Sequence, residues 1–313
     1  MAPQLPSRVS IREVGPRDGL QHEDVILTTE QKIRLIDHLS HTGVTLIEVG
    51  AFVRPQKVPQ MADTGVVFER ITRQPGIVYS AIVPNVVGAR RAVAANADAI
   101  QVFLSASESH NRSNVNMSIE ESLAQAADVA PIVIGAGKLF DGVISVAFGC
   151  PFEGDVPAER VLEISGRLLD MGAAQITLGD TTGMGHPLLV GALVRAFRAR
   201  FPRAALRLHL HSARGAGLAN VLAGLEAGVD RYDASAGGIG GCPFAPGAPG
   251  NLCSEDLVHM LHEMGIATGI DLPALMACAR ELEVLLGHEV PGQTIKAGIC
   301  KHLAPDGAPR PPA

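Results

Sequence analysis

The stretch VSIREVGPRDG, residues 9–19, joins a predicted strand to a polar turn. Residues 9–14 form the strand, and Gly15-Pro16 ends it just before Arg17-Asp18-Gly19. A predicted helix follows, with Thr28-Thr29-Glu30 as its N-terminal cap signal and Gly43 at its end. This strand–turn–helix unit is the first of a series that runs along most of the chain.

Short apolar runs recur at a regular spacing after this unit. The further predicted strands are residues 45–49, 77–83, 99–104, 142–148, 175–178, 206–210 and 231–234. Continuous apolar runs are typical of parallel strands covered on both faces, and about eight strand–helix cycles predict an α/β fold of the (β/α)8 TIM-barrel type. The rival is an open doubly wound sheet, which usually carries a glycine fingerprint for phosphate after its first strand. That fingerprint is absent from this sequence.

The chain of 313 residues fits one large α/β domain. We expect a single barrel domain over residues 1–303, which includes extra C-terminal helices at 254–264 and 272–286. Residues 304–313 are rich in Pro and Gly, so we expect a disordered tail there.

Composition argues against several classes of function. The net charge is −6, no basic stripe is present, and two Tyr with no Trp offer little surface for base stacking, so nucleic acid is not an expected partner. The N-terminus does not resemble a secretory signal, and no run of about 20 apolar residues could span a membrane. The five Cys form no CxxC pair, which is typical of reduced thiols in a cytoplasmic protein.

Polar residues gather where the predicted strands end. The ends of parallel barrel strands meet at one mouth, where the active sites of TIM barrels lie. We therefore expect one shared site there. Its candidate members are Arg17, Asp18, Gln21, Glu48, Ser107, Asp180, Thr181, His209, His211 and the glycine-rich segment 237–250.

His209 and His211 have the spacing of two metal ligands. Residues two apart on a strand point to the same face, about 7 Å apart along its axis. Two imidazole nitrogens, with Asp18 as a carboxylate ligand, suit a divalent ion that keeps open positions for a substrate oxygen. A pair of hydrogen-bonded core histidines, and a turn-forming Asp18 before Gly19, are the alternatives.

Three further residues have candidate roles in the same site. Arg17 could stabilise a developing enolate oxygen, or it could be an ordinary surface ion pair. Cys242 lies in a loop that could approach a ligand and move as a lid, where its thiol could transfer a proton. The alternative for Cys242 is a small buried residue in a structural turn. Asn251 could orient or ligate, or it could lie near a helix N-cap.

These motifs resemble the 3-hydroxy-3-methylglutaryl-CoA lyase family, a group of pyruvate carboxyltransferase-like TIM-barrel metallolyases. The resemblance covers about residues 9 to 290, and the Cys-containing loop is its most specific element. The motifs are VGPRDGLQ (14–21), VPQM (58–61), LGDT (178–181), HLH (209–211) with Ala219-Asn220, and GGCPFAPG (240–247) with Gly250-Asn251.

The resemblance implies metal-dependent retro-Claisen cleavage of 3-hydroxy-3-methylglutaryl-CoA to acetyl-CoA and acetoacetate, as in leucine catabolism. It implies Mg²⁺ or Mn²⁺ bound by Asp18, His209 and His211 with Asn251 near or on the metal, and a homodimer. In that scheme Asp18 is the base, Arg17 stabilises the thioester enolate, and Cys242, with His209, protonates the acetyl carbanion. Glu48 and Asp180 support these groups. Arg17, Gln21, Ser107 and Thr181 are expected to contact the acyl-CoA substrate.

Four positions depart from the family pattern, namely Asp24, Arg54, Val143 and Ser212. None is an expected metal ligand, but together they could reshape the acyl pocket. A closely related 3-hydroxyacyl-CoA is therefore also a candidate substrate. Two other functions stay open at this point: a Claisen-type acyl-CoA synthase on the same barrel, and a non-catalytic barrel.

Overall fold

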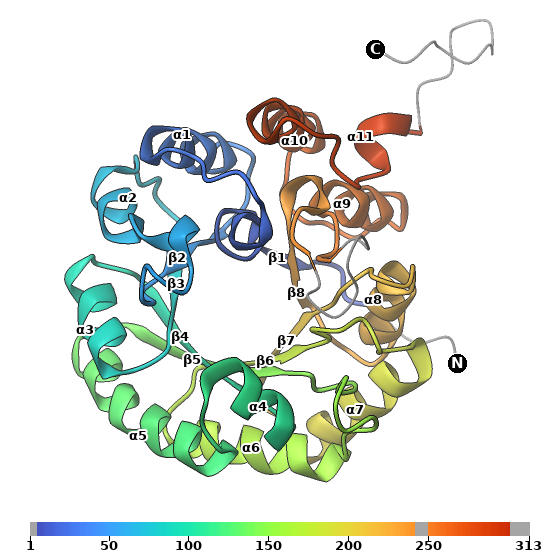
Figure 1. Cartoon of the computed structure of the whole chain (residues 1–313). Helices are drawn as coiled ribbons and strands as arrows, with labels where there is room; N and C mark the ends of the chain where they lie inside the picture. The colour runs from blue at the N-terminus through green and yellow to red at the C-terminus, as the bar shows by residue number, and fades with distance from the viewer. Residues whose placement is uncertain (1–4, 242–249, 301–313) are drawn as a thin grey trace, which may run out of the picture.

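A computed structural model describes residues 5–241 and 250–300 of the chain. Eight parallel strands close into a barrel in chain order (Figure 1), which confirms the predicted (β/α)8 fold. The strands are β1 (Ser10–Glu13), β2 (Leu46–Ala51), β3 (Val78–Val83), β4 (Ala99–Ser105), β5 (Leu139–Ser145), β6 (Gln175–Gly179), β7 (Ala205–His209) and β8 (Arg231–Ala234).

Helices surround the barrel and cover the outer faces of the strands (Figure 1). Those that follow β1 to β7 are α1 (Thr29–Leu39), α2 (Thr64–Arg70), α3 (Val86–Ala94), α4 (Glu108–Val115), α5 (Ile119–Gly135), α6 (Ala158–Asp170), α7 (Pro187–Arg200) and α8 (Gly217–Glu226). After β8 come the predicted C-terminal helices α9 (Ser254–Glu263) and α10 (Leu272–Leu286), and then the short α11 (Thr294–Ala297). Helix α10 packs against both α1 and α9 and so closes the ring of helices.

In the part of the chain that is described, no helix is both long and apolar enough to cross a membrane. The single domain over residues 1–303 stays a prediction. The expected tail at 304–313 lies outside the described residues.

Helix α1 begins as predicted but ends early. Thr28 accepts a hydrogen bond from the backbone N–H of Gln31, and Gln31 reaches back to the Thr28 N–H at 2.8 Å, which makes a capping box. The helix ends at Leu39, four residues before Gly43, which the sequence marked as its end. Gly43 instead forms the turn into β2 at φ +88, where an added Cβ would lie 2.2 Å from the Gly269 carbonyl oxygen.

Strand β5 lies three residues upstream of its predicted position at 142–148. Asp141 belongs to the strand and is buried. The prediction began the strand after Asp141, because buried strands were expected to be apolar. The strand ends before Val146, which has φ +51, a left-handed conformation that β-branched residues rarely adopt.

The barrel interior is polar below the mouth, which the apolar strand pattern did not predict. Arg12 on β1 donates from Nε and Nη2 to the two Asp233 carboxylate oxygens, at 2.9 and 2.6 Å. Its Nη1 donates to Gln101 Oε1 at 2.5 Å. All three side chains are almost fully buried. Because buried charges need partners, this interior network defines the floor of any site at the mouth.

Candidate active site

Three predicted metal ligands converge at the carboxyl ends of the strands. Asp18 lies in the turn Gly15–Gly19 after β1, His209 is the last residue of β7, and His211 follows two residues later. His209 Nε2 lies 3.0 Å from His211 Nε2 and 3.7 Å from Asp18 Oδ2. One ligand atom from each of the three residues lies within 4.8 Å of the others. The strand spacing therefore placed both imidazoles correctly, although β7 itself ends at His209.

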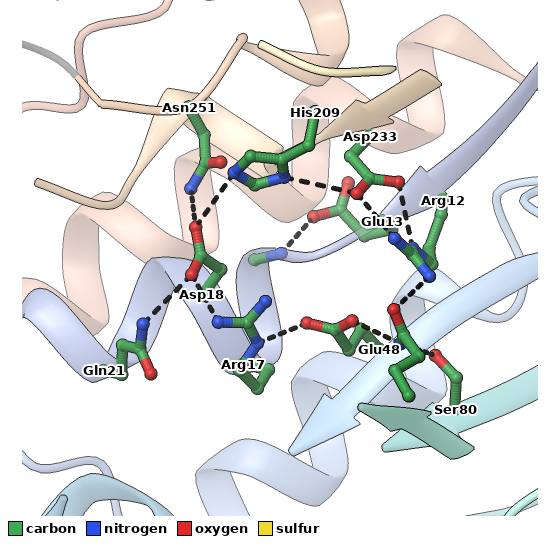
Figure 2. A network of polar contacts seen from close by, with 12 residues as sticks. Arg12, Glu13, Arg17, Asp18, Gln21, Glu48, Ser80, His209, Asp233 and Asn251 are labelled. Atoms are coloured by element: carbon green, nitrogen blue, oxygen red, sulfur yellow. Dashed lines mark hydrogen bonds and ion pairs between the residues drawn. The ribbon is translucent and has the colours of Figure 1, made fainter. Parts of the chain in front are cut away.

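A carboxylate behind His209 sets the direction of its ring. His209 Nδ1 lies 3.2 Å from Asp233 Oδ2, so the Nδ1 proton points to Asp233 and Nε2 points toward Asp18 (Figure 2). The same Nε2 is the atom that lies near His211. A carboxylate behind a histidine is the usual arrangement in metal sites, because it fixes the tautomer and raises the basicity of the ligand nitrogen. Asp233 lies inside β8, and no motif in the sequence marked it.

The charges of this cluster suit a divalent cation. Burial alone would raise the pKa of Asp18, but Arg17 and the neighbouring histidines outweigh burial and hold that pKa well below its usual range. Burial, and then the neighbouring His209, lower the pKa of His211 to about 3. At neutral pH the cluster therefore offers an ionised carboxylate and a neutral imidazole, the forms that bind metal. The residues present fit the ion that the resemblance implies.

Asn251 contacts the cluster through Asp18. Its Nδ2 donates to Asp18 Oδ2 at 2.8 Å and to the Ile239 carbonyl oxygen at 3.2 Å. In this orientation the amide holds the carboxylate in place, and direct ligation through the amide oxygen stays a prediction. The Asn251 backbone also pairs with His211 in an isolated bridge, which joins the end of the glycine-rich loop to the site.

Arg17 lies between two carboxylates. Its Nη1 donates to Asp18 and its Nε donates to Glu48, and no hydrogen bond joins the remaining nitrogen, Nη2, to the described residues. Glu48 is fully buried on β2 and also accepts from Gln101 Nε2 at 2.5 Å. The sequence predicted both residues as site members, and the structure places them side by side.

These contacts form one continuous ring of charged and amide side chains (Figure 2). Within the ring, each side chain is held on two sides, which fixes its orientation. In order of contact its members are Asp18, Arg17, Glu48, Gln101, Arg12, Asp233 and His209. Gln101, Arg12 and Asp233 were missed at the sequence level. Their only signal was a polar residue inside a predicted strand.

The other predicted site residues have different surroundings. Gln21 donates to Asp18 Oδ1 at 3.0 Å and so joins the cluster. Asp180 accepts from the Gly185 N–H at 2.9 Å and holds the turn after β6, where burial raises its pKa to about 6. Ser107 caps α4 and lies 2.9 Å from the thiol of Cys150, and Thr181 accepts from the Val146 N–H at 3.1 Å. Their roles toward a substrate stay predictions.

Cys242 lies outside the described residues, but both flanks of its loop lie at the site. An added Cβ at Gly240 would lie 2.5 Å from Asn251 Nδ2 and 3.4 Å from the Asp18 carbonyl oxygen. An added Cβ at Gly250 would lie 2.0 Å from the Gly240 carbonyl oxygen. Only glycines allow these approaches, so the two ends of the loop meet beside Asp18.

Two buried carboxyl groups, both missed at the sequence level, hold the base of this loop. Glu13 accepts from the N–H groups of Gly15 and Ala236 at 2.8 and 2.9 Å, and from Ser254 Oγ at 2.6 Å. Glu255 accepts from the Gly237 N–H and from the Cys253 thiol, both at 2.8 Å. Glu13 thereby joins the turn that carries Asp18 to Ala236, in the 3-10 turn after β8, and to Ser254 at the start of α9.

Replacing Glu255 with Gln is expected to flatten the pH dependence of stability. Burial raises the pKa of Glu255 from 4.5 to about 8, so between these values the folded chain keeps a proton that the unfolded chain has lost. The free energy of unfolding therefore falls as pH rises through this window. In the variant this pH dependence should be weaker, by up to the equivalent of about one proton released on unfolding. Urea unfolding at pH 5, 6, 7 and 8 measures it. A slope equal to that of the wild type would contradict the assignment, and exposed Glu69→Gln is the matched control.

Comparison with known proteins agrees with this geometry. The HMGL-like family model matches residues 8–282. The chain is 42 % identical over 291 residues to hydroxymethylglutaryl-CoA lyase of Bacillus subtilis (strain 168), covering 93 % of this chain and 97 % of that one. It is 47 % identical over 272 residues to the mitochondrial hydroxymethylglutaryl-CoA lyase of Rattus norvegicus, covering 87 % and 84 %.

A solved structure adds a bound small molecule to the comparison. An HMG-CoA lyase from Acinetobacter baumannii, in complex with coenzyme A and 3-methylmalate, superposes with a TM-score of 0.91 at 45 % identity, over 96 % of this chain and 98 % of that one. These relatives are carbon–carbon lyases, which favours a lyase over a synthase or a non-catalytic barrel. The chain is an enzyme of the HMGL-like family and resembles the hydroxymethylglutaryl-CoA lyases over nearly its whole length.

Proposed function

We propose that the chain cleaves 3-hydroxy-3-methylglutaryl-CoA to acetyl-CoA and acetoacetate by a retro-Claisen reaction. The observation that carries the proposal is the convergence of Asp18, His209 and His211 at the barrel mouth with Arg17 beside them. Curated lyases at 42 and 47 % identity over most of the chain support the same reaction.

Asp18, His209 and His211 would hold the divalent metal, Mg²⁺ or Mn²⁺. Hard carboxylate oxygens with imidazole nitrogens are compatible with either ion. When bound, the metal supplies a Lewis acid that polarises the substrate oxygens at the bond to be broken. Asp233 keeps the His209 ring in its binding orientation, and Asn251 and Gln21 hold the two oxygens of Asp18.

In this scheme Asp18 accepts the proton of the tertiary hydroxyl. Arg17 and the neighbouring histidines hold the pKa of Asp18 below its usual range, so the carboxylate is ionised at neutral pH and can accept that proton. Arg17 donates to the oxygen of the thioester enolate as the carbon–carbon bond breaks, through the nitrogen that the ring of contacts leaves available. Cys242, whose loop ends beside Asp18, protonates the carbanion to give acetyl-CoA.

Of the four positions that depart from the family pattern, Val143 is the one most relevant to the acyl group of the substrate. It pairs in register with Phe103 on one side and Thr177 on the other, and all three lie on the strand face that also carries Asp141. Val143 and Phe103 are only partly buried. Asp24 and Arg54 are exposed, and Ser212 donates its backbone N–H to the Gly250 carbonyl at 2.7 Å. Because Val143 could change the acyl pocket, a related 3-hydroxyacyl-CoA is a second substrate to assay.

The homodimer and the cytoplasmic location that the sequence led us to expect stay predictions.

Removing the metal is expected to abolish turnover. EDTA treatment followed by gel filtration should leave a folded protein without lyase activity, because the substrate oxygens lose their Lewis acid. Adding Mg²⁺ or Mn²⁺ should restore activity, whereas Ca²⁺, which prefers more oxygen ligands, should restore less. Undiminished turnover in the metal-free protein would rule out the proposed chemistry.

A further inference from the structure

A second group of metal-binding side chains lies on the outer surface of α9, away from the barrel mouth. It consists of His259, Glu263 and Cys300, whose ligand atoms lie within 4.8 Å of one another. His259 and Glu263 are one helical turn apart on α9, and Cys300 follows α11. The mechanism proposed above uses none of the three.

One face of α9 brings these residues together. Asp256, His259 and Glu263 recur at intervals of three and four residues, so they form a stripe along the helix. Asp256 accepts from the backbone N–H groups of Gln293 and Thr294 at 3.0 and 2.6 Å, which fixes the start of α11 on this face. The residues that follow α11, 298–300, then lie next to this stripe on α9.

A glycine turns that segment back onto the stripe. Gly298 ends α11 at φ +77, a conformation that a side chain would strain. Ile299 packs against the hydrophobic core, and the backbone N–H of Cys300 donates to His259 Nε2 at 3.3 Å. The Cys300 thiol is exposed and its Sγ lies 3.4 Å from the same nitrogen.

The donor atoms of His259 and Cys300 have the separation that a tetrahedral ion requires. With metal–nitrogen and metal–sulfur distances of roughly 2.0–2.1 and 2.3 Å, a tetrahedral site places N and S roughly 3.5 Å apart. Here the distance from His259 Nε2 to Cys300 Sγ is 3.4 Å. Nε2 now accepts a hydrogen bond from the Cys300 N–H, and a bound metal would take the place of that contact on the same lone pair. Glu263 is exposed, and one of its carboxylate oxygens lies within 4.8 Å of the ligand atoms of His259 and Cys300.

We propose that His259, Glu263 and Cys300 form a second metal site that takes Zn²⁺ or an ion of similar softness. A thiolate and an imidazole select zinc over Mg²⁺, so this site and the barrel mouth prefer different ions. Three protein ligands leave the fourth tetrahedral position to water. Bound metal would tie the segment after α11 to α9 and stabilise that edge of the molecule.

Cobalt absorption tests the proposal on the full-length protein. Co²⁺ replaces Zn²⁺ in such sites, and only a cobalt–thiolate bond gives a charge-transfer band in the near ultraviolet. In excess Mg²⁺ under reducing conditions, we expect one such band per chain that Zn²⁺ abolishes. Cys300→Ser should remove the band, and His259→Ala or Glu263→Gln should weaken cobalt binding at least about tenfold. All three variants should keep Mg²⁺-dependent lyase activity, so this test does not depend on the proposed function.

Two control variants separate this site from other sources of the signal. Cys242→Ser should keep the band, because Cys242 is not one of the three proposed ligands. His262→Ala changes an exposed histidine on the same helix that instead contacts Thr268, and it should leave cobalt affinity unchanged. A band that persists in Cys300→Ser, or one unaffected by both His259→Ala and Glu263→Gln, would overturn the site. The second result would mean a lone thiolate that binds metal adventitiously.

Discussion

Asp18→Asn is expected to lower kcat for cleavage of 3-hydroxy-3-methylglutaryl-CoA by about 10³-fold. The amide has nearly the same shape but carries no charge, so the metal loses its one carboxylate ligand and the hydroxyl proton loses its acceptor. Arg17 also loses the negative charge of one of its two partners. Steady-state kinetics across a Mg²⁺ titration measures the effect, and we expect both a lower kcat at saturation and a higher metal requirement.

Asp24→Asn is the matched control for this substitution. Asp24 lies six residues further along the same segment and is exposed, so its variant should retain wild-type kcat and the wild-type requirement for Mg²⁺. If Asp18→Asn retained more than about a tenth of wild-type kcat, Asp18 would be neither the proton acceptor nor an essential ligand.

Arg17→Met is expected to lower kcat by about 10²–10³-fold, the usual effect of removing one donor to a developing oxyanion. KM should change much less, because the guanidinium acts on charge that appears only as the carbon–carbon bond breaks. Arg17→Lys keeps the positive charge but cannot donate to Glu48 and Asp18 in the same fork geometry, so it should recover only part of the rate.

Stability must be separated from catalysis in the Arg17 variants. Removing Arg17 leaves the buried Glu48 carboxylate without its cation, which should lower the melting temperature. The double variant Arg17→Met with Glu48→Gln removes both charges and should regain much of that stability. We expect it to remain inactive. Recovery of activity together with stability would show that Arg17 only supports the fold.

The barrel was predictable because its pattern is local and repeated. Each strand–turn–helix unit has its own apolar run, several helices have a side-chain cap, as at Thr28, and the eight strands close in chain order. The predicted ends of an element were wrong where a residue departs from the local pattern because of its contacts in the folded chain. Asp141 lies inside β5 because it faces buried arginines, and Val146 ends that strand in a conformation that its side chain disfavours.

The candidate ligands Asp18, His209 and His211 were predictable, but Arg12 and Asp233, which lie behind His209, were not. Asp18 follows a turn motif, and His209 and His211 have the spacing of a strand, so both signals are local in sequence. Arg12 and Asp233 are 221 residues apart and meet only because β1 and β8 are neighbours in the closed barrel. No local pattern indicates which polar residue of a strand will face which other strand.

Product analysis tests the central claim most directly. The purified protein would be incubated with 3-hydroxy-3-methylglutaryl-CoA and Mg²⁺, and acetyl-CoA and acetoacetate would be quantified by mass spectrometry, with Asp18→Asn as the inactive control. We expect the two products in a 1:1 ratio, formed by the wild type and almost absent in the variant. Neither product from a folded protein that still binds metal through Asp18, His209 and His211 would contradict the claim, and would direct the search to another 3-hydroxyacyl-CoA.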